Sequence, residues 1–496
     1  MVKKMKMKKY IQSMMAFAAI VSFASCSSED NNTTIENESA TKVMTFTATQ
    51  EGDEQSTRAA ISSTDSKVIN WQEEDQISIF DGKTNNQFTL KNGAGTKSAT
   101  FQGNAATAAK YTAVYPYQSE ASYDTSNGNV TGITLKPTQT ATDNSFDKNA
   151  ALMMAKSTNT TLEFKNAVGY VKVKPKFACS KIVLQAAEES EYLAGRCTLS
   201  YGDGMPSIAF TSEQSTSITL LGTITANTVY YIAVPAVTLT AGWSISFTDN
   251  TGDVYTRTGS KEIEFKRNTI INLGEFSRTD NNLKLTLTQN GKVPADKQVD
   301  MGVFNIGGTK YRLIFAKSNL TTTGLAASES AYGDYFAWGA TKPWYLSISG
   351  DTFTWKPDHS SGYASGTAPA FSPEYTSEKD FEMSDDPARK ILGGDWQIPT
   401  KAIWEALVGI KSKNWDSNKK GYKFTNNSQT LFLPAAGYVR GKNFHEYGSG
   451  ARYWSGTASS IYDAYRLSFS DSKLNVSNIV RQYGCSVRPV RLVAVD

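Results

Sequence analysis

The chain offers few side chains for covalent or metal chemistry, because it holds only four cysteines and two histidines. His359 and His445 are far apart in the sequence, and neither lies in a spacing that metal sites use. The sequence contains neither a Gly-x-Ser-x-Gly nucleophile turn nor a phosphate-binding loop. We therefore expect a protein that is not an enzyme and that carries no metal and no cofactor.

Cys26 is the cysteine whose surroundings suit a modification. Five lysines near the N-terminus precede an apolar run over residues 14–24, which is too short to span a bilayer as a permanent helix. Phe23-Ala24-Ser25-Cys26 then resembles a bacterial lipobox, where the signal peptide is cut before the cysteine and the new N-terminus is lipidated. An ordinary secretory signal followed by a chance cysteine is the alternative. Acyl chains on Cys26 would anchor the protein to a membrane without spanning it.

The segment after Cys26 is polar, and its acids Glu29 and Asp30 follow the cysteine closely. Such a segment cannot bury enough apolar surface to fold alone, so it indicates a flexible tether. Early acids of this kind resemble the surface-export signal of lipoproteins in some Gram-negative bacteria. We expect a lipid-anchored outer-membrane protein that is displayed at the cell surface.

Charge and composition exclude nucleic acid as a partner and favour an exported β protein. Removing the five signal-peptide lysines takes the formal net charge from +4 to −1, so the basic character belongs to the signal peptide. Roughly 470 residues then remain, enough for two to four domains. The chain is rich in Thr, Ser, Tyr and Phe, which is typical of strands.

The pattern of strands and turns predicts a mainly β protein made of two tandem β-sandwiches and a C-terminal α+β domain. In the last domain, helices are expected to start at Ser384 and at Thr400 as N-caps. The expected parts are a signal peptide (1–25), a tether (26–40), two sandwiches (41–160 and 161–275), a linker (276–297) and the α+β domain (298–496).

Cys179 and Cys197 lie in two strand-like runs. An oxidising compartment would permit a disulfide between them, and two buried thiols are the alternative. Cys485 is expected to be a core residue.

Residues 41–275 resemble fimbrillins, the pilins and anchors of donor-strand-type surface fimbriae. The resemblance implies two β-sandwich domains, a lipoprotein precursor and assembly with other fimbrial subunits by donor-strand exchange. Its motifs are WQEEDQISIF at 71–80, YTAVYPY at 111–117, ALMMA at 151–155, LEFKN at 162–166, LAG at 193–195 and VP at 234–235.

Residues 298–495 resemble a second family, the surface domains with a C-type-lectin-like fold that formylglycine-generating enzymes share. That enzyme chemistry needs a pair of cysteine thiolates to hold copper, and this region contains only Cys485. The motifs are VDMG at 299–302, AKSNL at 316–320, GDYFAWG at 333–339, LGGDWQIPT at 392–400, LPAAG at 433–437, YWSGT at 453–457 and GCSVRPV at 484–490. We expect these motifs to be framework, with Trp338, Trp396 and Trp454 as large apolar groups and Arg488 as a buried ion-pair or backbone-clamp residue.

Two aromatic and polar stretches are candidate ligand sites, because ring faces cover apolar sugar faces while amides and hydroxyls bond the rim. The first stretch, 342–380, looks like a long functional loop, and the alternative is a loop that packs on its own domain. The second, 438–447, could instead be a solvated hairpin. The candidate contacts are Trp344, Tyr345, Trp355, His359, Tyr363 and Tyr375 in the first stretch and Arg440, His445 and Tyr447 in the second.

These features predict a surface lipoprotein adhesin, a fimbrial tip or accessory subunit whose C-terminal domain binds a glycan or protein ligand. A purely structural pilin or anchor, or a lipoprotein that captures glycans, are the alternatives. Arg58 follows the first expected strand and is the candidate site for the proteolytic processing that the fimbrillin resemblance implies. The last residues, 487–495, are expected to belong to the C-terminal domain's own sheet.

Cys26→Ala tests the anchor. We expect the variant to stay unprocessed or to become soluble, because no thiol remains to carry the acyl chains. Mass spectrometry of the mature N-terminus and protease shaving of whole cells measure this, with Ser27→Ala as the control. The anchor assignment is wrong if the Cys26→Ala protein stays fully membrane-bound and surface-exposed.

Overall fold

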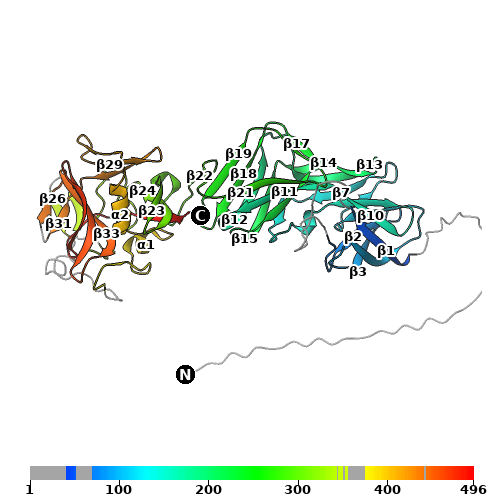
Figure 1. Ribbon diagram of the computed structural model, residues 1–496, viewed down its shortest axis with the longest axis horizontal. Helices are drawn as coiled ribbons and strands as arrows, with labels where there is room; N and C mark the ends of the chain where they lie inside the picture. Colours follow the sequence, from blue (N-terminus) through cyan, green and yellow to red (C-terminus); the bar gives the residue numbers. More distant parts are fainter. Residues whose placement is uncertain are drawn as a thin grey trace, which may run out of the picture. The chain divides into compact units, whose positions relative to one another are not determined.

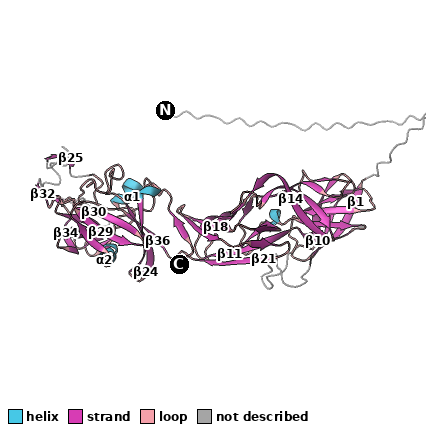
Figure 2. Ribbon diagram, turned by 90° about the horizontal axis from the view of Figure 1, so that it is seen from above, coloured by secondary structure: helices cyan, strands magenta, loops and turns pink. Residues whose placement is uncertain are grey.

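The structure is a computed structural model. It describes residues 41–51, 70–342, 375–440 and 443–495, together with the backbone of two short strands within 345–355. Strands dominate this part of the chain, and the helices are few and short (Figure 2). The protein is therefore mainly β, as the sequence predicts. Among the described residues, no helix has both the length and the apolar character needed to cross a membrane.

The N-terminal strands close into a barrel in the order β1-β10-β9-β5-β2-β3-β4, where the sequence predicts a sandwich. Strands β1, β2, β3 and β10 of this barrel lie close together in Figure 1. Strand β10 pairs parallel to β1, so the barrel extends past the boundary expected at residue 160. The barrel strands are β1 (Lys42–Gln50), β2 (Gln76–Phe80), β3 (Asn85–Asn92), β4 (Ser98–Ala105), β5 (Tyr111–Tyr115), β9 (Met153–Ser157) and β10 (Thr161–Asn166).

Trp71 lies at the centre of the barrel core and is fully buried. Its ring packs edge-on against Phe101, Tyr115 and Phe164 at centroid distances of 5.0, 5.4 and 5.5 Å. The indole N–H donates to the carbonyl oxygen of Ala48 on β1 at 3.2 Å, which satisfies its one polar atom. The core therefore holds β1 through both packing and a hydrogen bond.

Strands from the middle of the chain pair with strands β7 and β8, which lie in the same part of the sequence as the barrel strands. Strand β8 joins the six-stranded sheet β22-β19-β18-β12-β15-β8, and the hairpin β13–β14 pairs with β7. The remaining sheets here are β16-β11-β21 and β17-β20. The strands are β6 (Ser122–Tyr123), β7 (Val130–Leu135), β8 (Thr138–Thr140), β11 (Val168–Pro175), β12 (Cys179–Ala186), β13 (Ala194–Gly202), β14 (Met205–Ser215), β15 (Ser217–Ile224), β16 (Tyr230–Pro235), β17 (Val237–Leu239), β18 (Trp243–Asp249), β19 (Val254–Gly259), β20 (Ile263–Phe265), β21 (Ile270–Phe276) and β22 (Lys284–Thr286), with a 3-10 turn at Lys148–Ala150.

The segment 276–297, expected as a linker, is ordered into both of its neighbours. Strand β22 pairs with β19 of the preceding sheet. At the other end, Asn290 donates to Asp395 at 2.8 Å and its carbonyl oxygen accepts the Trp396 indole N–H at 2.9 Å. Specific contacts therefore fix this connection on both sides.

The C-terminal domain combines short antiparallel sheets with two helices. The sheets are β23-β24-β36, β27-β33-β34-β35, β28-β29-β30, β31-β32 and β25-β26. The elements are β23 (Gln298–Ile306), β24 (Thr309–Ala316), β25 (Tyr345–Ser349), β26 (Thr352–Trp355), β27 (Lys379–Asp380), α1 (Pro387–Leu392), α2 (Lys401–Val408), β28 (Lys413–Asp416), β29 (Gly421–Asn426), β30 (Gln429–Pro434), β31 (Tyr438–Arg440), β32 (Asn443–His445), β33 (Gly450–Ala458), β34 (Asp463–Ser470), β35 (Leu474–Val480) and β36 (Val490–Ala494), with a 3-10 turn at Ala295–Lys297.

Thr400 caps α2 as predicted, and its hydroxyl accepts the Ile403 N–H. The predicted cap at Ser384 is wrong, because α1 is capped by Asp386. The Asp386 carboxylate accepts the N–H groups of Ala388, Arg389 and Ile398, and Pro387 occupies the first helical position, where no N–H is needed. Burial raises the pKa of Asp386 to about 6.

Arg488 acts as the backbone clamp that the sequence suggests. It is fully buried, donates to the Asn319 side chain at 3.0 Å, and donates to the carbonyl oxygen of Phe432 at 2.9 Å. The large aromatic residues of the motifs are also framework, since Trp338, Trp396 and Trp454 are fully buried and each donates its N–H to a backbone carbonyl.

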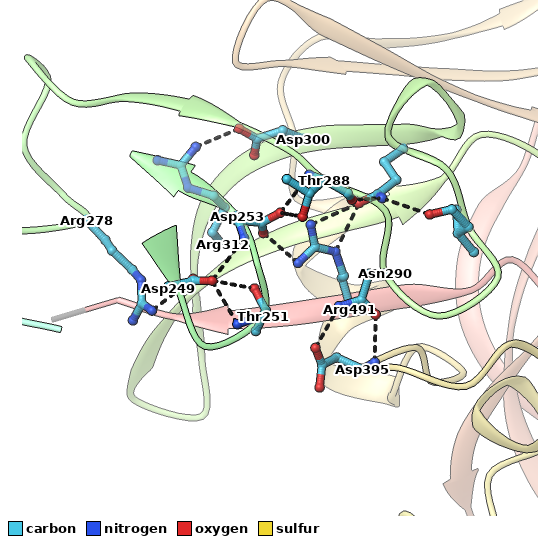
Figure 3. A network of polar contacts seen from close by, with 12 residues as sticks. Asp249, Thr251, Asp253, Arg278, Thr288, Asn290, Asp300, Arg312, Asp395 and Arg491 are labelled. Atoms are coloured by element: carbon cyan, nitrogen blue, oxygen red, sulfur yellow. Dashed lines mark hydrogen bonds and ion pairs between the residues drawn. The ribbon is translucent and has the colours of Figure 1, made fainter. Parts of the chain in front are cut away.

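A buried ion pair fastens the last strand of the chain to the preceding sheet. Arg491 on β36 lies 2.7 Å from Asp253, which stands just before β19, and both side chains are at most 1% exposed (Figure 3). Gln298 accepts two further hydrogen bonds from Arg491, at 2.9 and 3.1 Å. Arg278 adds a second fastening by donating to the carbonyl oxygen of Ala494 at 3.2 Å. We call this group the junction cluster.

The two charges of the pair depend on each other. Among the described residues, the paired atoms Arg491 Nη1 and Asp253 Oδ2 have no other hydrogen-bond partner. Removing one of them leaves the other buried and uncompensated, which is far more costly than replacing both. The pair therefore constrains β36 to remain where it is.

Arg491→Met tests this dependence. We expect the free energy of unfolding to fall by about 3–5 kcal/mol, because Asp253 would stay buried without its cation. Adding Asp253→Asn should recover part of the loss. Urea denaturation followed by tryptophan fluorescence measures both effects. Arg312→Met is the control, since its pair with Asp300 is partly exposed. Equal losses for Arg491→Met and Arg312→Met would show that the buried pair has no special role.

Candidate functional site

The hairpin β31–β32 carries a stack of rings and cations that we call the hairpin site. Tyr438 lies nearly parallel to His445 at 5.0 Å and to Tyr483 at 5.9 Å between ring centroids. The guanidinium carbon of Arg452 is 3.4 Å from the Tyr438 ring centroid, and that of Arg440 is 5.6 Å from the Tyr483 ring centroid. Rings and guanidinium groups in this arrangement attract one another through cation–π contacts.

Backbone pairing brings these distant residues together. Val439 exchanges hydrogen bonds with Gly484 in an antiparallel bridge, which places Tyr483 opposite Arg440 and within stacking distance of Tyr438. Gly437 has a positive φ of 66°, and a side chain there would collide with the carbonyl oxygen of His445. Only glycine therefore allows β31 and β32 to approach this closely.

A second group of rings lies on the opposite face of the same hairpin, because Phe444 pairs with Val439 and points away from the Tyr438 stack. Tyr447 is 39% exposed, packs edge-on against Tyr332 at 5.0 Å and lies 5.3 Å from Phe444. Phe444 in turn packs against the buried Tyr335 at 5.0 Å. Burial raises the pKa of the Tyr332 hydroxyl, so this group stays neutral at physiological pH. These rings form a partly exposed, uncharged surface on that face.

Three arginines give the hairpin site a positive character. Arg452 pairs with Glu446 at 3.1 Å, and Arg440 is exposed. Arg466 lies on β34 opposite Trp454 of β33, and burial, followed by the charge of Arg452, lowers the pKa of its guanidinium group. Among the described residues, Arg466 Nε, Arg466 Nη1 and Arg452 Nε lack hydrogen-bond partners.

Two predicted contacts, Arg440 and His445, therefore fall together at the hairpin site, and the third, Tyr447, lies with the second group of rings. Tyr375 lies in neither group, because it is only 2% exposed and packs against Trp338 and Phe381. Its hydroxyl donates to Asp385 at 2.8 Å and accepts the Glu382 N–H. The prediction of Tyr375 as a ligand contact is wrong, because the ring is part of the core.

For the other predicted ligand contacts, the structure describes no side chain. Tyr345 and Trp355 pair across strands β25 and β26, of which only the backbone is described. This hairpin lies within a stretch expected to have no regular structure, and both views place it at the same end of the domain as β31–β32 (Figures 1 and 2). Outside the described residues lie Cys26, Arg58, Trp344, His359 and Tyr363.

Sequence reasoning missed Arg452, Arg466 and Tyr483 at the hairpin site, and Tyr332 in the second group of rings. Arg452 and Tyr483 stand next to motifs that were correctly interpreted as framework, and nothing in the local sequence distinguishes them. The sequence near Tyr438 is rich in aromatic and basic residues, and this was the one signal of a site there. The other residues of the site join it only through pairing between strands that are far apart in the sequence.

Cys179 and Cys197 are not joined by a disulfide. Cys179 lies in the core of the second set of sheets, whereas Cys197 lies in the barrel core. The disulfide that the sequence permits is therefore absent, because the side chains of Cys179 and Cys197 are buried in different cores. Burial raises the pKa of both Cys197 and Cys485 to about 12, so these thiols are poor nucleophiles in the folded protein.

The described residues contain no group of three or more His, Cys, Asp or Glu side chains placed to hold a metal ion. Of the two histidines, His445 is stacked on Tyr438, and His359 lies outside the described residues. What the hairpin site can offer chemically is recognition by ring faces and guanidinium donors.

Comparisons with known proteins give a partial picture. A family model described as "Domain of unknown function (DUF8237)" matches residues 410–490. No curated protein matches the chain.

Several solved structures are similar to parts of the chain. A candidate cell adhesion protein of Bacteroides uniformis is 15% identical, with 44% of this chain and 91% of that chain covered and a TM-score of 0.30. Another from Bacteroides ovatus is 11% identical, with coverages of 50% and 97% and a TM-score of 0.33. A fimbrial protein of Bacteroides ovatus is 10% identical, with coverages of 90% and 98% and a TM-score of 0.29. Likenesses this distant fix neither the family nor the function of this chain.

Proposed function

We propose that the protein is a surface lipoprotein adhesin that forms one end of a fimbria. Its C-terminal domain, for which the motifs suggest a C-type-lectin-like fold, would bind a glycan or protein ligand on a host or bacterial surface. Its N-terminal region would receive a strand from a neighbouring fimbrial subunit. Lipid on Cys26 would hold the precursor in the outer membrane before assembly.

The observation that supports an end position is the state of the last strand. Strand β36 pairs antiparallel with β24 from Phe315 to Tyr311, and Val490 exchanges hydrogen bonds with Gln397 on its other side. The junction cluster then fixes its side chain at Arg491. A strand held in this way is not available for donation to a neighbour, which is the property expected of a subunit that accepts a strand without giving one.

Strand β1 supplies the matching acceptor position. It lies antiparallel to β4 and parallel to β10, with Phe46 and Ala48 fully buried. Removing β1 would leave both neighbours with unpaired backbone groups and would open the core where these two side chains sit. An incoming strand with apolar residues at alternate positions would satisfy both needs. Cleavage at Arg58 would release β1 together with the lipid.

Arg58→Ala tests the proposed assembly. We expect the variant to fold normally and to remain in the membrane, but to be absent from fibres, because β1 would still occupy the acceptor position. Immunoblots of sheared fimbriae and of outer membranes measure the distribution, and circular dichroism checks folding. Lys83→Ala, which removes an exposed cation from the barrel region, is the control. Normal incorporation of the Arg58→Ala protein would sink the processing hypothesis.

A further inference from the structure

We propose that the hairpin site selects acidic glycans, binding a carboxylate or sulfate group through arginine while its rings cover the sugar. This inference rests on the proposed role of the C-terminal domain in ligand binding. It names the class of ligand for a site to which nothing else assigns one.

The first argument is the balance of charge. Arg440, Arg452 and Arg466 come from three different strands, and the carboxylate that the structure places against them is Glu446. Glu446 is 42% exposed and pairs only with Arg452 among the ion pairs of the described residues. The cluster therefore keeps a net positive charge, which raises the local concentration of anions.

The second argument is the supply of donors. Arg452 pairs with Glu446, whereas Arg466 and Arg440 make no ion pair among the described residues, and two nitrogens of Arg466 have no hydrogen-bond partner there. Arg440 is exposed on β31, and its guanidinium group is held near the Tyr483 ring rather than extended freely into solvent. A guanidinium group presents paired N–H donors that match a carboxylate or a sulfate, so Arg440 is the direct contact we assign.

The third argument concerns the shape of the ligand. The partly exposed rings of His445 and Tyr483, which stack with Tyr438, give a flat ring surface on the face that carries the arginines. Ring faces cover the C–H faces of a pyranose, whereas an acidic peptide has no equivalent flat apolar face. The combination of rings and cations therefore favours an acidic sugar over an acidic peptide.

The test uses the full exported chain, from residue 27 on, and matched glycans that share one core. One arm carries a sialic-acid carboxylate, the second a sulfate ester, and the third neither. We expect stronger binding to one or both acidic forms than to the neutral form, and weaker binding as salt rises from roughly 50 to 500 mM. Arg440→Gln should weaken binding to the acidic glycan about tenfold or more without altering folding, and Arg440→Lys should restore part of it.

Lys411→Gln, which removes an exposed cation after α2, is the matched control and should bind like the unmodified chain. Equal binding to neutral and acidic glycans, or stronger binding to a poly-glutamate peptide, would overturn the acidic-glycan inference and leave the adhesin proposal standing. Binding to surface proteins but to no glycan would have the same consequence. Failure to bind any glycan or surface protein would overturn both.

Discussion

The ion pair between Arg491 and Asp253 is the constraint on which the rest of this structure depends. Both charges are almost fully buried, and each is compensated by the other. Such a pair adds little net stability compared with apolar residues, but breaking it is costly, so it favours one arrangement over others. Here the arrangement that it favours keeps β36 paired in its own sheet, with Gln298 and Arg278 contributing additional bonds.

The hairpin site depends on buried contacts elsewhere in the C-terminal domain, which hold the strands that carry its residues. Arg452 and Arg466 come from the paired strands β33 and β34, and the buried Trp454 ties β33 to the segment at Phe336 by a hydrogen bond. Arg488 ties the segment just before β36 to Phe432 on β30. Rings and cations that are far apart in the sequence can therefore stay within contact distance in the absence of a ligand, which reduces the entropic cost of binding.

Local sequence signals predicted local features well. Thr400 caps α2, Arg488 is a backbone clamp, and the tryptophans of the C-terminal motifs are core residues, because residue type and neighbours determine each of these. Ser384 failed as a cap since Asp386 offers a carboxylate just before a proline that can start the helix. Two plausible caps so close together cannot be ranked without their tertiary partners.

The sequence alone could not predict which distant strands pair with each other. The parallel pairing of β1 with β10 closes a barrel across the expected boundary at residue 160, and no local pattern encodes which strand closes it. Tyr375 was predicted as a ligand contact because aromatic residues in an irregular stretch look alike whether they point inward or outward. Arg452 and Tyr483 were missed for the related reason that only the fold places them beside Tyr438.

The central claim is that this subunit accepts a strand but does not donate one, and the position of the protein on the fibre tests it most directly. Antibodies against the C-terminal domain, visualised with gold particles on negatively stained fimbriae, report this position. We expect particles at fibre ends. Particles spaced along the whole shaft would contradict the claim, because a subunit within the shaft must donate a strand as well as accept one.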